Sequence, residues 1–115
     1  MMQKIITVVA LAFTIFLTSI TSFVLADTVP NLNNGAKVFE ANCAGCHAKG
    51  GNIVRRGKNL KLKALRKNKV DTQDMIASLV TNGKNNMSAY GEKLTAEQIS
   101  DVSAYVLQKA EQGWK

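Results

Sequence analysis

The chain has 115 residues, 46% of them hydrophobic, and its 15 Lys and Arg outnumber 8 Asp and Glu, which gives a formal charge of +7. This length allows one domain, and the composition excludes a large multidomain enzyme, a coiled coil and a disordered chain. A core this small rarely stabilises a fold without disulfides, a metal or a large cofactor. Because Cys43 and Cys46 are the only two cysteines, a disulfide network is ruled out and a cofactor is favoured.

The N-terminal segment has the pattern of a secretory signal peptide. A short head with one cation, Lys4, precedes an apolar run over residues 5–17, and a small-residue cleavage pattern ends at Ala26. We therefore expect a cleaved signal peptide over residues 1–26 and an exported domain over residues 27–115. The alternative is an uncleaved membrane anchor, because the apolar run is nearly long enough to span a bilayer. The Thr and Ser residues from Thr14 onward and the cleavage pattern favour cleavage.

The first helix expected in the exported domain runs into the cysteine pair. Asn33 or Asn34 is expected to cap it, and Val38, Phe39 and Cys43 share one face at helical spacing. Residues 60–65 predict a short helical turn further along the chain.

Two further helices are expected in the second half of the chain. Asp71 is expected to cap the first, which ends at the stop pair Asn82-Gly83. Its apolar stripe comprises Met75, Ile76, Leu79 and Val80. The last helix begins at a capping box between Thr95 and Gln98, and its apolar face comprises Ile99, Val102 and Val106. No segment alternates with period two or resembles a hairpin, so the sequence predicts an all-α domain.

The residues that carry chemistry are consecutive, at positions 43–47. Cys43, Cys46 and His47 form the pattern C-x-x-C-H, in which two thiols add across the vinyl groups of haem and the adjacent imidazole binds its iron. A thioredoxin-like dithiol would need a βαβ setting, which the sequence does not predict. A structural zinc site would need four ligands, and the chain has no other Cys or His. The motif therefore predicts one covalently bound haem.

The second axial ligand of the iron must come from another residue type, because His47 is the only histidine. The candidates in the exported domain are Met75 and Met87, since a thioether is a soft, neutral ligand that raises the reduction potential. Met75 lies on an apolar helix stripe, where packing against haem or a helix is the simpler role. Met87 lies in a polar loop over residues 82–91 that could bring its sulfur over the haem. Two axial ligands leave no open coordination position, which favours an electron carrier over an enzyme.

At this point the sequence resembles the cytochrome c6 family of algae and cyanobacteria. The similarity is carried by residues 34–39, 42–48, 82–87, 105–107 and 112–114. It implies a class I cytochrome c fold with Cys43 and Cys46 bonded to haem, His47 and Met87 on the iron, and a close helix crossing at Gly35. It also implies a monomeric photosynthetic electron carrier of the thylakoid lumen, in a plastid or a cyanobacterium. Such a carrier takes electrons from the cytochrome b6-f complex and passes them to photosystem I.

The chain departs from the family pattern in three places. Relatives usually have Met-Pro-Ala-Phe where this chain has Met-Ser-Ala-Tyr at residues 87–90, and commonly a glutamine where Leu79 stands. The polarity of residues near haem tunes its potential. The third departure is a basic segment over residues 49–69, which carries nine Lys and Arg and no acidic residue. It is either a solvated surface or a patch that steers an acidic partner.

Three functions are compatible with these residues. The first is the photosynthetic carrier. The second is a c-type cytochrome that donates to a terminal oxidase, or a lower-potential cytochrome c6-like paralogue. The third is a haem sensor or peroxidase with an open iron position. Nucleic acid binding is not expected, because an exported haem protein would not meet nucleic acid.

Overall fold

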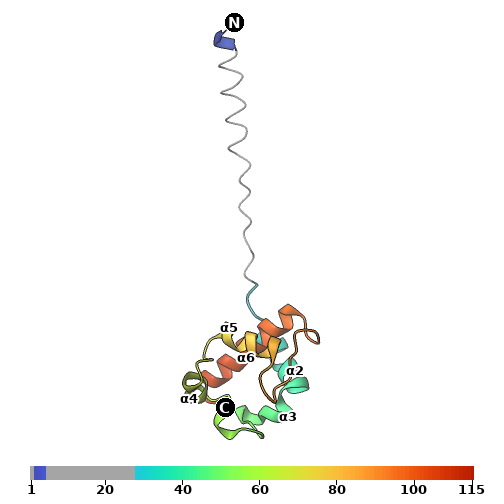
Figure 1. Cartoon of the computed structure of the whole chain (residues 1–115), viewed down its shortest axis with the longest axis vertical. Coiled ribbons are helices and arrows are strands. Elements are labelled where there is room, and N and C mark those ends of the chain that lie inside the picture. The colour runs from blue at the N-terminus through green and yellow to red at the C-terminus, as the bar shows by residue number, and fades with distance from the viewer. Residues whose placement is uncertain (1, 5–27) are drawn as a thin grey trace.

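The computed structural model describes residues 2–4 and 28–115. In the longer range, helices follow one another along the chain and are joined by loops (Figure 1). They are α2 (Leu32–Asn42), α3 (Ala44–His47), α4 (Leu62–Lys67), α5 (Gln73–Asn82) and α6 (Ala96–Glu111), with short 3-10 turns at Ala48–Gly50 and Arg56–Lys58. The one β feature within residues 28–115 is an isolated bridge between Lys84 and Met87. The all-α prediction is thus confirmed for the described residues.

The predicted signal peptide, residues 1–26, lies outside the described residues except for positions 2–4. Among the residues that are described, no helix combines the length and the apolar character needed to cross a membrane.

Helices α2 and α6 cross at Gly35, as the resemblance implied. A Cβ atom at Gly35 would collide with the Asp101 carbonyl oxygen and would lie 2.8 Å from the Tyr105 Cβ, so only glycine allows the two backbones to meet here. The buried Asp101 carboxylate strengthens the crossing. It accepts hydrogen bonds from the Asn31 backbone N–H at 2.7 Å and from Asn34 Nδ2 at 2.9 Å.

Two predicted helix caps were wrong, by two or three residues and by one residue, and the third was right. Helix α2 is capped by Asn31, not by Asn33 or Asn34, and its side chain accepts from the Asn34 N–H at 3.0 Å. Helix α5 is capped by Thr72, not by Asp71. The capping box of Thr95 and Gln98 is present at the start of α6, with both reciprocal hydrogen bonds formed.

The core lies along α6, on which α2, α5 and α4 pack. Its buried apolar side chains are Val38, Phe39, Leu65, Ile76, Val80, Ile99, Val102, Val106 and Ala110. An aromatic cluster extends it, with the ring of Phe39 centred 5.5 Å from Tyr105 and 5.3 Å from Trp114. The indole N–H of Trp114 donates to the Leu60 carbonyl at 2.9 Å and so ties the 60–65 region to the end of α6.

Candidate functional site

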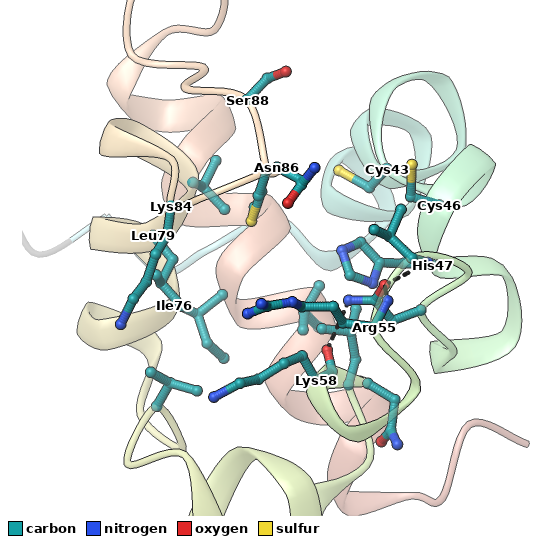
Figure 2. Close-up of a pocket in the computed structure, with 18 of the residues that line it drawn as sticks. Cys43, Cys46, His47, Arg55, Lys58, Ile76, Leu79, Lys84, Asn86 and Ser88 are labelled. Carbon is teal, nitrogen blue, oxygen red and sulfur yellow. Dashed lines mark hydrogen bonds between the residues drawn. The ribbon is translucent and has the colours of Figure 1, made fainter.

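A cavity of about 320 Å³ opens between two walls of the domain. One wall is the C-x-x-C-H segment (residues 43–47), and the other is α5 together with the Met87 loop (residues 83–91). Figure 2 shows Cys43, Cys46 and His47 on one side of this space and Ile76, Leu79, Asn86 and Ser88 on the other. Its apolar lining comes chiefly from Phe39, Leu60, Leu65, Val70, Ile76, Leu79, Val80, Val102 and Val106.

Both cysteines line this cavity as free thiols. Cys43 is half-buried at the C-terminal end of α2, and Cys46 is exposed on the short helix α3. Burial, with a smaller contribution from Cys46, raises the pKa of the Cys43 thiol from 9.0 to about 11. Cys43 is therefore a neutral thiol at ordinary pH.

The imidazole of His47 is oriented by a backbone carbonyl. Its Nδ1 lies 2.8 Å from the Gly51 oxygen. Because a carbonyl only accepts, Nδ1 carries the proton and Nε2 keeps the lone pair that a metal needs. Such a bond is the usual way in which a protein fixes the tautomer and ring direction of a ligating histidine.

The loop after the motif forms the lower edge of the cavity, and sequence analysis did not assign it there. The Asn52 side chain accepts from the backbone N–H groups of Val54 at 3.0 Å and Arg55 at 2.8 Å, and donates to the Lys58 carbonyl at 3.1 Å. These bonds hold Arg55 and Lys58 at the cavity, and Figure 2 shows Arg55 beside His47 with Lys58 below it. The available signal was their position a few residues after the motif, within the basic segment.

Met87 lines the cavity, and Met75 does not. Met75 is 46% exposed and belongs neither to the cavity lining nor to the core, so the expectation that it packs against haem was wrong, and its packing against a helix stays a prediction. The turn that carries Met87 is closed by backbone hydrogen bonds between Met87 and Lys84, at 3.0 and 3.1 Å. It also packs closely on Gly83, where a Cβ would lie 2.6 Å from the Met87 carbonyl oxygen and where φ is +67°.

Tyr90 completes this side of the cavity. Its ring packs against the core, and burial raises its pKa above the usual 10, with smaller contributions from Cys43 and Cys46. Its hydroxyl donates to the Asn42 carbonyl at 3.1 Å. Tyr90 thus reaches from one wall of the cavity to the other.

The donor set fits haem. Two thiols, an imidazole with a free Nε2 and a thioether face one mostly apolar space, and these are the groups that attach and ligate haem in c-type cytochromes. Arg55, Lys58 and Lys84 add positive charge at the cavity edge, which suits a cofactor that carries carboxylates.

Comparisons with known proteins agree with this chemistry. Residues 30–106 match a family model described as cytochrome c oxidase, cbb3-type, subunit III. A protein named cytochrome c6-like from Nostoc sp. (strain PCC 7120) is 46% identical over 114 residues, which covers 99% of this chain and 100% of that relative.

Solved structures give the same result. Cytochrome c6C from Synechococcus sp. PCC 7002 is 61% identical with a TM-score of 0.67, and the match covers 69% of this chain and 96% of that one. Cytochrome c6 from the diatom Phaeodactylum tricornutum is 44% identical with a TM-score of 0.71, and the match covers 73% and 99% respectively. The predicted class I cytochrome c fold is therefore confirmed, and the chain belongs to the cytochrome c6 family of single-haem c-type cytochromes.

Proposed function

We propose that the protein is a soluble, monomeric electron carrier rather than an enzyme. In this proposal Cys43 and Cys46 would hold haem through thioether bonds formed by addition of each S–H across a vinyl group, and His47 and Met87 would ligate its iron. The observation that carries this proposal is that all four donor side chains line one mostly apolar cavity.

The residues of the chain have separate roles in this function. When bound, the haem supplies a one-electron couple at its iron. His47 is held in direction by the Gly51 carbonyl and would be one ligand of the iron, and Met87 would be the other, which would leave no position for a substrate on the metal. Apolar side chains from α5 and α6 exclude water from the cavity, which limits solvent rearrangement when the charge changes.

We further propose that the carrier works in photosynthesis, in the thylakoid lumen, after cleavage of residues 1–26. In this proposal the cytochrome b6-f complex reduces it and photosystem I oxidises it. The support is its membership of the cytochrome c6 family. A reduction potential raised by Met87 would suit that route, because the potential of the carrier must lie between those of its donor and its acceptor.

The basic segment indicates what kind of surface the partner presents. Its nine cations are all exposed, and within the described part of the chain none forms an ion pair: they are Lys49, Arg55, Arg56, Lys58, Lys61, Lys63, Arg66, Lys67 and Lys69. Arg55 and Lys58 lie at the cavity edge, and the apolar Ile53 and Val54 beside them are 72% and 58% exposed. This arrangement suits brief docking of the cavity edge, where haem would be bound, to an acidic surface of the partner.

A second candidate is a lower-potential cytochrome c6-like paralogue with a different acceptor. Two observations favour it. Identity is higher to cytochrome c6C, 61%, than to the diatom cytochrome c6, 44%. Leu79 also lines the cavity at the position where the cytochrome c6 family commonly carries glutamine, and polarity there tunes the potential.

Two measurements test these proposals. In the parent protein, haem should stay bound to the polypeptide during denaturing electrophoresis, and in the Cys43→Ala/Cys46→Ala double variant it should not. Haem that stays attached in the double variant would contradict the thioether assignment. A redox titration of the parent holoprotein, with flash kinetics of photosystem I, then separates the two routes. Rapid re-reduction of photosystem I supports the photosynthetic carrier. A potential below that of the donor complex, with no re-reduction, supports the paralogue.

A further inference from the structure

The Met87 loop is anchored mainly on the wall to which it belongs. Its two ends are held on α5 by backbone hydrogen bonds of 2.8 Å, from the Gly83 N–H to the Leu79 carbonyl and from the Tyr90 N–H to the Val80 carbonyl. The turn over residues 84–87 is closed only on itself. These bonds shape the loop but do not tie it to the opposite wall.

One hydrogen bond does cross the cavity. The Tyr90 hydroxyl donates to the Asn42 carbonyl at 3.1 Å, joining residues that are 48 positions apart in sequence. Within residues 28–115, no other hydrogen bond from the Met87 loop reaches α2 or the C-x-x-C-H segment.

The acceptor is well placed for this task. Asn42 is the last residue of α2 and directly precedes Cys43, so its carbonyl is one of those that a helix end leaves without an internal partner. A hydrogen bond to this carbonyl therefore satisfies one free acceptor at the end of α2, and it connects the Met87 loop to the residue next to Cys43.

The segment between Met87 and Tyr90 packs on Gly83, but within the described residues neither Ser88 nor Ala89 makes a hydrogen bond. Ser88 and Ala89 are exposed, and within the described residues the Ser88 N–H donates no hydrogen bond. A proline at position 88 would restrict φ through its ring, and serine does not supply that restraint. The position of the Met87 sulfur then depends on how firmly the end of the loop is held.

We propose that Tyr90 is a positioning residue for Met87: its hydroxyl, bound to the Asn42 carbonyl, holds the Met87 loop across the cavity and keeps the thioether inside. This role rests on the proposed function of Met87 as an iron ligand. Loss of one neutral hydrogen bond should raise the open fraction of the loop about two- to tenfold. The rate at which an external ligand replaces the sulfur should rise by the same factor.

The test measures replacement of the sulfur by imidazole in ferric holoprotein, followed by loss of the sulfur-to-iron absorption band. Tyr90→Phe keeps the ring and removes the hydroxyl, and it should exchange about two- to tenfold faster than the parent. Tyr105→Phe is the matched control, because within the described residues the Tyr105 hydroxyl makes no hydrogen bond. Adding Ser88→Pro to Tyr90→Phe should bring the rate back toward that of the parent.

Each outcome has a defined meaning. Equal rates for Tyr90→Phe and the parent, or equal acceleration in Tyr90→Phe and Tyr105→Phe, would overturn the positioning role while leaving Met87 as the ligand. A parent without the sulfur-to-iron band would instead contradict the ligand assignment itself. Hydrogen exchange at the Met87 and Tyr90 amides is a second readout: Tyr90→Phe should speed exchange there, with no change in α6.

Discussion

Gly35 is the position at which we expect one methyl group to have the largest effect. In a Gly35→Ala variant the new Cβ would collide with the Asp101 carbonyl oxygen. It would also lie 2.7 Å from the Asp101 carbonyl carbon and 2.8 Å from the Tyr105 Cβ. Separations below 3.0 Å are essentially never seen for real Cβ atoms. Because the obstacle is backbone, no side-chain rotation relieves it, and α2 must move away from α6.

The size of the effect follows from two opposing contributions. Overpacking a well-packed contact costs about 1 to 3 kcal/mol, and alanine in a helix gains about 0.5 to 1 kcal/mol over glycine. With backbone as the obstacle we take the upper part of the first range, which leaves a net loss of about 1 to 2 kcal/mol in the free energy of unfolding. In a domain of this size that lowers the melting temperature by about 5 to 15 °C.

The assay is thermal melting of ferric holoprotein, followed by circular dichroism. Gly57→Ala is the control, because a Cβ at Gly57 meets nothing within 4 Å. We expect Gly57→Ala to melt with the parent and Gly35→Ala well below it. If Gly35→Ala also melted with the parent, the two helices would not be in the contact described.

Three other substitutions, two of them paired with a control, test separate parts of the structure. Met87→Ala should abolish the sulfur-to-iron absorption band, lower the reduction potential and open the iron to cyanide or carbon monoxide. Met75→Leu, at a half-exposed site, should change none of these properties. The reverse pattern would assign the ligand role to Met75. Arg56→Glu should slow electron transfer to an acidic partner at low salt more than Lys37→Glu, which makes the same charge change on α2. The difference between the two rates should narrow as added salt reduces the screening length to about 8 Å. Equal slowing by both variants would show that the basic segment does not steer the partner. Trp114→Phe keeps an aromatic ring but loses the indole donor and should cost about 1 kcal/mol in the free energy of unfolding, measured by denaturant titration; an unchanged midpoint would show that this bond contributes nothing.

The helix starts show what local sequence can and cannot predict. Thr95 and Gln98 satisfy each other within one turn, so the start of α6 could be predicted from spacing alone. The start of α2 could not, because several nearby asparagines are equally good local caps. The backbone N–H of Asn31 bonds to Asp101, which lies 70 positions away in sequence, and no local pattern contains that contact.

Only part of the candidate site could likewise be predicted from local sequence. The C-x-x-C-H pattern is local, so it places both thiols and the imidazole directly. The contribution of Arg55 to the cavity depends on how Asn52 folds the following loop, which the run of charges does not reveal. Met75 was misplaced because helical spacing identifies a stripe but does not say how far neighbouring elements cover its edge.

The crossing of α2 and α6 also bears on the order in which we expect the site to be assembled as the chain folds. The contact between Asn31 and Asp101 has to close a loop of 70 residues. Such long loops close late, since their closure costs the most chain entropy. Until that loop closes, we expect Cys43 and Cys46 to be accessible to haem, because the wall that carries Met87 is not yet in place. Attachment of haem would then precede enclosure of its iron.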